Sequence, residues 1–236
     1  MDRNLIDRLA AAKAGHRPVV VATDLASGEK TWIEGGTAAG PVRVDETLLA
    51  AANTAQRDDR SRTIETNDGR RLFLHVFNPP LRLLIVGAVH IAQSLAPIAA
   101  LAGYAVTVID PRGSFATADR FPSVVLTDDW PDEALAALKP DARTAIVTLT
   151  HDPKLDDPAL HSALRSDCFY IGSLGSRRTH ASRVQRLQQA GFGSDEIARI
   201  RGPIGLDIGA TSPAEIALAI MGEITATLRR PQAKAA

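Results

Sequence analysis

Residues 81–112 carry the pattern that most constrains the fold, namely a strand, a glycine turn, a helix and a second strand that ends in an acid. An apolar run over residues 83–86 stops at Gly87, and a helical pattern then leads to a β-branched run, residues 106–109, that ends on Asp110. This order is the first half of a dinucleotide-binding βαβ unit. Asp110 lies 23 residues after Gly87, close to the spacing of about 20 expected for a carboxylate that accepts from a ribose hydroxyl.

The glycine fingerprint of this unit is incomplete. A G-x-G-x-x-G motif starting at Gly87 would have glycines at the positions of Val89 and Ala92. Alanine is tolerated at the last position, where the helix packs on the strand. The branched side chain of Val89, in contrast, stands where the backbone would approach a pyrophosphate. The pattern therefore predicts the fold more strongly than it predicts a nicotinamide cofactor.

The composition argues against nucleic-acid and membrane partners. The 236-residue chain has 27 basic and 27 acidic residues, so no overall attraction to nucleic acid or anionic lipid is expected. Aromatic residues make up 4% of the chain, which disfavours base-stacking surfaces. Residues 1–15 are charged and lack the apolar region of a signal peptide, and no apolar run approaches the roughly 20 residues that span a bilayer. We therefore expect a cytoplasmic protein.

Cys168 is the single cysteine. One cysteine excludes an internal disulfide framework and a CxxC metal site, and no metal site is expected. Cys168 belongs to a predicted buried strand over residues 168–171, where apolar surroundings raise the pKa of a thiol and make it inert.

The first 78 residues are predicted to form a small α+β domain. The expected elements are helices over 4–14 and 44–55 and strands over 18–23, 30–34, 63–66 and 71–76. Asn67-Asp68-Gly69 lies between the last two strands and indicates a hairpin, because Asn and Gly tolerate positive φ. Asn78-Pro79-Pro80 marks the boundary, since proline blocks helix continuation and stiffens the link.

Residues 81–230 are predicted to form a second domain in which strands and helices alternate. Strands are expected over 82–86, 105–109, 123–126, 144–149, 168–171 and near 203–208, and helices over 90–102, 131–138, 156–165, 176–190 and 212–229. Such alternation predicts an α/β, Rossmann-like fold with a mostly parallel, doubly wound sheet.

A glycine-rich turn after the fifth of these strands is the clearest candidate ligand site. Ligands of open α/β sheets bind at the carboxyl ends of the strands. A turn that runs into a helix N-terminus exposes unpaired N–H groups at the positive end of the helix dipole, and cations there oppose the dipole unless an anion is bound. The residues of this turn and first helical turn are Gly172, Ser173, Gly175, Ser176, Arg177 and Arg178. The segment predicts a phosphate site; in the alternative, Ser176 only caps the helix and both arginines face solvent.

Titratable residues follow the other strand ends. His90 and His151 are candidate functional residues, and His151 with Asp152 is the candidate catalytic pair, as a base with its orienting carboxylate or half of a metal site. A histidine that only bonds a loop carbonyl is the alternative. Asp110 is predicted either to bind a ribose hydroxyl or to cap the following turn. Arg112 is predicted either to bind a 2′-phosphate or to pair with Asp110.

The segment from Gly205 to Ala210 places Asp207 between two glycines, ahead of a capped final helix. Positive φ at the glycines would let this loop return to the ligand site and bring Asp207 with it. A tight turn without a ligand role is the alternative.

Several of these segments resemble the XdhC/CoxI family, the accessory proteins of xanthine dehydrogenase and related molybdenum hydroxylases. The resemblance covers residues 81–229 and rests on LLIVGAVHIA, VIDPRGSFATADRFP, TLTHDPKLDDPAL, YIGSLGSRRTHASRVQRL and PIGLDIGATSPAEIALAIMGEI. It implies a Rossmann-like C-terminal domain behind a small N-terminal domain, in a protein that binds and protects molybdenum cofactor and is not itself an enzyme.

The resemblance also implies partners and site residues. The bound cofactor, molybdopterin in its mono- or dinucleotide form, would receive its sulfido ligand through a cysteine desulfurase and then enter a xanthine- or CO-dehydrogenase-type hydroxylase apoenzyme. Family analogy makes a homodimer a reasonable expectation. Phosphate contacts would come from Gly172, Gly175, Ser176, Arg177 and Arg178, and the cleft lining from His90, Asp110, His151 and Asp207.

Two departures from the family pattern keep other functions open. Val89 replaces the second glycine of the family's G-x-G-H turn, and Thr37 stands where the N-terminal G-G-C-x-E segment has cysteine, whose sulfur a hydroxyl cannot replace. The alternatives are an NAD(P)-dependent oxidoreductase, favoured by Asp110 and Arg112, and a nucleotide-sensing interaction module on the same core.

Overall fold

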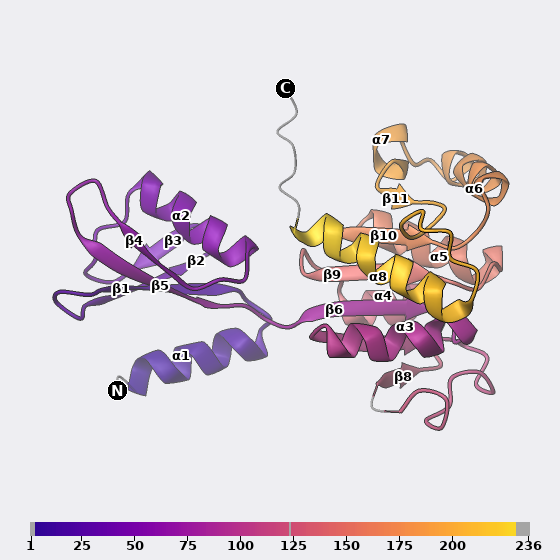
Figure 1. Ribbon diagram of the computed structural model, residues 1–236, viewed down its shortest axis with the longest axis horizontal. Coiled ribbons are helices and arrows are strands. Elements are labelled where there is room, and N and C mark those ends of the chain that lie inside the picture. The colour runs from indigo at the N-terminus through magenta and orange to yellow at the C-terminus, as the bar shows by residue number, and fades with distance from the viewer. Residues whose placement is uncertain (1–2, 123, 230–236) are drawn as a thin grey trace. The chain divides into compact units, whose positions relative to one another are not determined.

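The computed structural model describes residues 3–122 and 124–229 and divides the chain into two compact units, residues 1–79 and 80–236. The two units are described separately below (Figure 1). Within the described residues, the helices are all too short or too polar to cross a bilayer.

Unit 1 is an antiparallel sheet with a helix on each face (Figure 1). Its elements are α1 (Arg3–Ala14), β1 (Val19–Asp24), β2 (Lys30–Glu34), β3 (Thr37–Ala39), α2 (Glu46–Arg57), β4 (Arg62–Glu65) and β5 (Arg71–Phe77), and the strand order is β3-β2-β1-β5-β4. Val20 of β1 packs in the core that contains α2, and Val21 packs in the core that contains α1. Alternate residues of a strand point to opposite faces, which explains why consecutive valines of β1 are all buried. The predicted hairpin at Gly69 is confirmed, since β4 and β5 pair antiparallel and Gly69 has φ +79°.

Unit 2 is a six-stranded sheet, parallel at every pairing. Its strands are β6 (Leu81–Val86), β7 (Tyr104–Ile109), β8 (Val125–Thr127), β9 (Thr144–Thr148), β10 (Tyr170–Ser173) and β11 (Ile200–Arg201). Its helices are α3 (His90–Leu101), α4 (Pro131–Leu138), α5 (Pro153–Leu164), α6 (Arg177–Gln189), α7 (Ser194–Ile197) and α8 (Pro213–Arg229). The core on one face of the sheet includes α3 and α8, and the core on the other includes α4, α5 and α6. The predicted Rossmann-like α/β fold with a small N-terminal α+β part is confirmed.

The strand order places a topological switch point beside the central strand. The sheet runs β11-β10-β9-β6-β7-β8, so the chain builds outward from β6 on one side and then from β9 on the other. β6 and β9 pair directly, from Arg82 with Thr144 to Val86 with Thr148. Loops after these two strands leave in opposite directions, and this is where open α/β sheets bind ligands.

The strand predicted near residues 203–208 is wrong. The last strand is instead the short β11, and the chain beyond it is a loop that leads to α8. Pro203 has no N–H to donate to a ladder, and the N–H of Leu206 donates to the carbonyl of Ala219 in α8 at 3.1 Å instead of to a strand. β3 and α7 were not predicted, and residue 123, where the third strand of this unit was predicted to start, lies outside the described residues.

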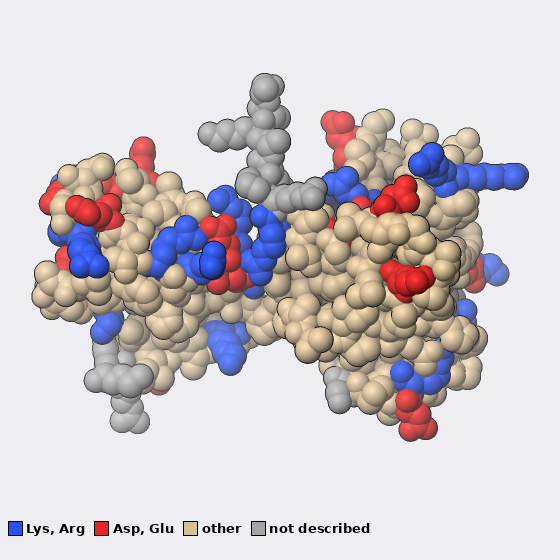
Figure 2. Space-filling model, in the orientation of Figure 1, with Lys and Arg blue, Asp and Glu red and all other residues tan. Residues whose placement is uncertain are grey.

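The charged side chains are distributed over the surface with both signs interspersed on the face shown in Figure 2. The part of unit 2 that α8 and α3 cover in that view is mostly uncharged. Leu101 at the end of α3 is 91% exposed and Leu218 of α8 is 55% exposed.

Candidate functional site

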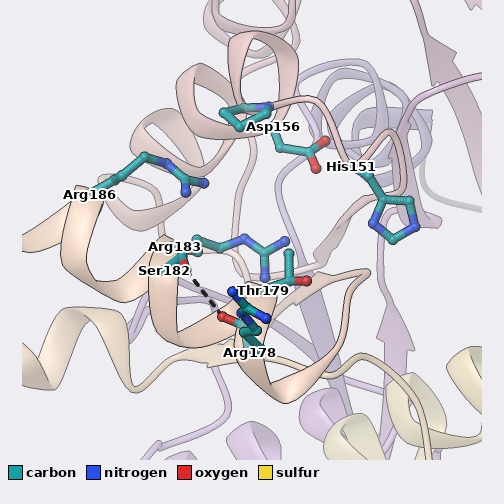
Figure 3. Close-up of a pocket in the computed structure, with 8 residues that line it drawn as sticks. His151, Asp156, Arg178, Thr179, Ser182, Arg183 and Arg186 are labelled. Carbon is teal, nitrogen blue, oxygen red and sulfur yellow. Dashed lines mark hydrogen bonds between the residues drawn. The ribbon is translucent and has the colours of Figure 1, made fainter.

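A pocket of about 260 Å³ lies between the start of α5 and one face of α6 (Figure 3). Its lining consists of His151, Pro153, Asp156, Arg178, Thr179, Ser182, Arg183 and Arg186. α5 follows β9 and α6 follows β10, so the pocket belongs to the carboxyl edge of the sheet. The switch point is between β6 and β9, and the pocket lies next to it, after β9 and β10.

The spacing of residues on α6 brings four polar side chains to the same face. Ser182 and Arg183 lie three and four positions after Thr179, and Arg186 lies three positions after Arg183, which is the spacing of neighbours on a helix surface. Ser176 fixes the start of this helix, because its hydroxyl accepts from the N–H of Thr179 at 3.1 Å.

Arg183 is the deepest side chain of the pocket, with 2% of its surface exposed. One terminal guanidinium nitrogen donates to the carbonyl of Leu174 at 2.8 Å, and the other lies 3.4 Å from Nδ1 of His180. Its Nε is buried and has no acceptor among the described residues. A buried donor without an acceptor costs about 1–3 kcal/mol. Figure 3 shows the guanidinium group extending into the space between Asp156 and Thr179.

Asp156 faces Arg183 across the pocket and is also 2% exposed. The hydroxyl of Thr150 donates to its carboxylate at 2.7 Å. Burial raises the pKa of Asp156 above its ordinary value, and the Thr150 bond and the charges of Arg183 and His151 only partly offset that effect. A carboxyl group with a raised pKa in a pocket is a common feature of functional sites.

The remaining charges make the pocket cationic. Arg186 is held in place by Asp157, with two bonds of 2.6 and 2.9 Å that raise the pKa of Arg186. Arg178 is exposed at the open side. Three guanidinium groups therefore line the pocket together with one carboxyl group whose pKa is raised. Such a set favours a multiply charged oxyanion, and arginine is well suited to phosphate because it presents several donors in a plane.

Two sequence-predicted residues, His151 and Arg178, lie in this pocket. His151 has φ +62°, a left-handed conformation that is uncommon for residues other than glycine and is found at functional sites. Asp152 caps α5 by accepting from the N–H of Lys154 at 2.9 Å. Arg177 is exposed and lies outside the lining of the pocket.

The glycine-rich turn before α6 is tightly packed. A side chain at Gly172 would come within 2.4 Å of Cδ1 of Ile204, and Gly175 has φ +142°. The hydroxyl of Ser173 is buried and bonded to that of Thr148. These residues shape the turn and Ser176 caps the helix, so the pocket meets the predicted phosphate segment only at Arg178.

The residues predicted after β6 and β7 lie at the switch point. Asp110 is fully buried and bonded to Arg112 and to the N–H of Ala88. His90 is the exposed first residue of α3, which begins without a side-chain cap. Asp207 is exposed in the loop between β11 and α8, outside the pocket lining.

Sequence reasoning did not assign Thr179, Ser182, Arg183 or Arg186 to the site. The available signal was the polar stripe at three- and four-residue spacing within 176–190, which falls inside a segment that carries the family resemblance. Among the described residues, acidic, histidine and cysteine side chains form no cluster that could hold a metal ion.

Comparison with known families gives a match to the model of the XdhC Rossmann domain over residues 83–224. The curated protein "molybdenum cofactor insertion chaperone PaoD" of Escherichia coli strain K12 is 33% identical over 148 residues, which cover 63% of this chain and 40% of that protein. A protein of Bacillus subtilis strain 168 that is named as a probable xanthine dehydrogenase subunit is 31% identical over 183 residues, which cover 75% of this chain and 53% of that protein. The chain thus spans about half or less of the length of these relatives.

Among solved structures, one described as a xanthine dehydrogenase from Bacillus halodurans aligns with a TM-score of 0.74 at 24% sequence identity. The alignment covers 96% of this chain and 67% of that one. This likeness shows a shared fold.

Proposed function

The chain belongs to the XdhC family, and from this premise we propose that it binds molybdenum cofactor and assists its insertion into a molybdenum hydroxylase of the xanthine- or CO-dehydrogenase type. The proposal is supported by the relative that is named a molybdenum cofactor insertion chaperone. The relative named for xanthine dehydrogenase supports the class of client enzyme.

The observation that carries the proposal is the unsatisfied Nε of Arg183 in the cationic pocket between α5 and α6. Molybdopterin ends in a phosphate monoester, and such a group carries a charge near −2 at neutral pH with three acceptor oxygens. One of these oxygens would supply the acceptor that Arg183 lacks. The cofactor is cargo in this proposal, so the pocket needs to hold it and release it without chemical change.

Each residue of the pocket has a distinct part in holding the phosphate. Arg183 would donate from the buried side, and Arg178 would close over the group from the exposed side. Arg186 is fixed by Asp157 and adds positive charge without moving. Thr179 lies on the same face, and its hydroxyl can donate to a phosphate oxygen, whereas the hydroxyl of Ser182 donates to the carbonyl of Arg178 at 3.3 Å.

We further propose that the sulfur of the cofactor is supplied by a separate cysteine desulfurase. The single cysteine, Cys168, is 5% exposed, and burial raises the pKa of its thiol. A buried thiol is a poor sulfur carrier, because the thiolate is the reactive form. Thr37 at the position of the family cysteine donates its hydroxyl to the carbonyl of Glu34 and offers no sulfur.

Mass spectrometry of the small molecule that co-purifies from a molybdenum-replete host tests the proposal, together with the molybdenum content of a co-expressed hydroxylase. Wild-type protein should retain molybdopterin and raise the molybdenum content of the hydroxylase. Arg178→Ala should lower the bound cofactor about tenfold or more, as expected for a lost charge-assisted bond. Arg177→Ala removes the same charge one residue away, outside the pocket lining, and should bind within about twofold of wild type. Wild-type protein that retains no molybdopterin and leaves the hydroxylase unchanged would refute the proposal.

A further inference from the structure

The place where a Rossmann fold holds the ribose of a dinucleotide is filled in this protein by its own side chains. In dinucleotide-binding units, the carboxylate after the second strand accepts from a ribose hydroxyl, and the glycine turn after the first strand lets the pyrophosphate approach. The corresponding positions here are Asp110, after β7, and the turn from Gly87 to Val89, after β6.

The carboxylate of Asp110 has no acceptor site left for a ribose. Its Oδ1 accepts from the backbone N–H of Arg112 at 3.0 Å and from Nε of Arg112 at 2.8 Å. Its Oδ2 accepts from the N–H of Ala88 at 2.8 Å and from a terminal nitrogen of Arg112 at 2.7 Å. An ionised carboxylate offers about four acceptor positions, so these four bonds use them all. Asp110 is also 0% exposed.

Charge and packing keep this pair in place. Burial alone would raise the pKa of Asp110, but the bonds from Arg112 and Ala88 hold it below its ordinary value, so the carboxylate stays ionised. The guanidinium of Arg112 packs over the ring of Phe115, with 4.5 Å from its central carbon to the ring centroid. Its pKa is raised mainly by Asp110. Arg112 follows the carboxyl end of β7, so it lies on the same edge of the sheet as the α5–α6 pocket.

The loop after β9 packs against the glycine turn that follows β6. A Cβ atom at Gly87 would lie 2.5 Å from Cγ2 of Thr150, in the loop after β9. The loop after β9 can therefore pack against Gly87 only because glycine has no side chain. The same loop positions Thr150 to bond Asp156. Val89, the N-cap residue of α3, places a branched side chain at the position of the second fingerprint glycine.

We infer that this unit excludes dinucleotides that need a ribose at the end of β7, and that Arg112 is the specificity-determining residue because it occupies the ribose position on Asp110. The inference deepens the proposed function and rests on it only for the location of the phosphate. It excludes nicotinamide dinucleotides and other ligands that need a nucleoside at the end of β7.

Titration of the full chain with ADP-ribose, the ribose-and-pyrophosphate part common to nicotinamide dinucleotides, tests the inference by calorimetry. Wild-type protein should bind ADP-ribose more weakly than about 1 mM, whereas micromolar binding would overturn the inference. Arg112→Ala should strengthen ADP-ribose binding about tenfold or more, since it frees the two acceptor positions on Asp110 that the guanidinium group occupies. If Arg112 acted only as a positive charge near the ligand, its removal would weaken ADP-ribose binding. A gain in affinity therefore distinguishes the two roles.

Arg120→Ala is the matched control, because Arg120 also packs near Phe115, at 5.8 Å, and makes no bond to Asp110. It should show no gain. Arg112→Met, which keeps an unbranched apolar side chain over Phe115, should reproduce the gain if the alanine variant is poorly folded. Unchanged ADP-ribose affinity in a folded Arg112 variant would overturn the role of Arg112. Inorganic phosphate, titrated separately, reports on the α5–α6 pocket, so its failure to bind would count against the proposed function and not against the exclusion of dinucleotides.

Discussion

Asp156 and Arg183 are two buried charged residues that face each other across the pocket, and neither has its charge fully satisfied by the chain. Arg183 has a buried Nε without an acceptor, and Asp156 is desolvated enough that its pKa is raised. Burial of charge is costly, and such groups are retained at sites where a ligand uses them. At the scale of single residues, this pair is the strongest indication that the pocket is built for an anion.

The raised pKa of Asp156 predicts a pH-dependent stability. Its ordinary value of 3.8 applies to the unfolded chain, so above that pH the unfolded state releases its proton before the folded state does. The free energy of unfolding should therefore fall as pH rises from about 4 through the raised pKa of the folded state. Asp156→Asn removes this decline while an amide oxygen still accepts from Thr150. Urea denaturation of both proteins from pH 4 to 7 measures the two free energies of unfolding. The stability of the asparagine variant relative to wild type should grow with pH. A relative stability that is constant over this range would contradict the raised pKa of Asp156.

The same substitution should affect anion binding in a predictable direction. Above the raised pKa, the ionised carboxylate repels phosphate, so Asp156→Asn should strengthen phosphate binding, about threefold or more, at pH 8. At pH 4 the two proteins should bind phosphate similarly. Isothermal titration at the two pH values provides the test. An asparagine variant that binds phosphate more weakly at pH 8 would show that the carboxylate supports the ligand.

Single residues of the site were only partly predictable from the sequence. His151 and Arg178 could be assigned because they follow strand ends, where ligands bind in this fold. Arg183 and Asp156 owe their character to burial, which depends on how α5 packs beside α6 and leaves no local mark in the sequence. The pairing of Arg112 with Asp110 was one of two alternatives, and in the structure Arg112 is bonded to Asp110.

At the scale of elements, the contact between the turn after β6 and the loop after β9 holds the switch point together. Gly87 has φ +106°, and the methyl group of Thr150 occupies the space beside it. Gly87→Ala should lower the free energy of unfolding by about 1–3 kcal/mol, from backbone strain and from overlap with Thr150. Chemical denaturation measures this loss.

Two further variants separate the causes of that loss. Gly103→Ala introduces a side chain at a similar φ of +88° into open space, so it should show backbone strain alone and a smaller loss. Thr150→Ser removes the methyl group and keeps the hydroxyl that bonds Asp156. It should recover part of the loss in the Gly87→Ala background and none in the Gly103→Ala background. Equal effects in both backgrounds would show that overlap with Thr150 is unimportant.

Whole elements were predicted best where hydrophobic period and capping agreed. The helix over Pro131–Leu138 matches its predicted range, with proline at its first position and acids in its first turn. The predicted strand near 203–208 failed because this segment is a loop tied to α8 by the bond from Leu206 to Ala219, an arrangement set by tertiary contacts. The short β3 and α7 gave no periodic signal long enough to detect.

At the scale of the whole molecule, the two units have separate hydrophobic cores. Val20, Leu72 and Leu74 belong to a core within unit 1, whereas the clusters on the two faces of the parallel sheet belong to unit 2. Residues 83–224, which match the family model, all fall in unit 2. We therefore expect the binding function to reside in unit 2 and the stability of unit 1 to be separable from it.

Leu74→Ala tests this separation, because Leu74 is 0% exposed in the unit 1 core. The substitution should destabilise unit 1 by about 2–5 kcal/mol. Scanning calorimetry should show one transition displaced to lower temperature and a second that is unchanged. Phosphate affinity at 25 °C should also be unchanged. A single transition that moves as a whole, or a loss of phosphate binding, would show that the two units are energetically coupled.

We propose that the buried Nε–H of Arg183 donates to a phosphate oxygen of the ligand. Proton–nitrogen NMR of the arginine Nε–Hε groups during a titration with inorganic phosphate tests it most directly, with the Arg183 signal identified by its loss in Arg183→Lys. This signal should shift downfield in a saturable manner, and Arg178→Ala should weaken the response. A phosphate-bound protein in which the Arg183 signal does not move would show that Arg183 does not donate to the phosphate.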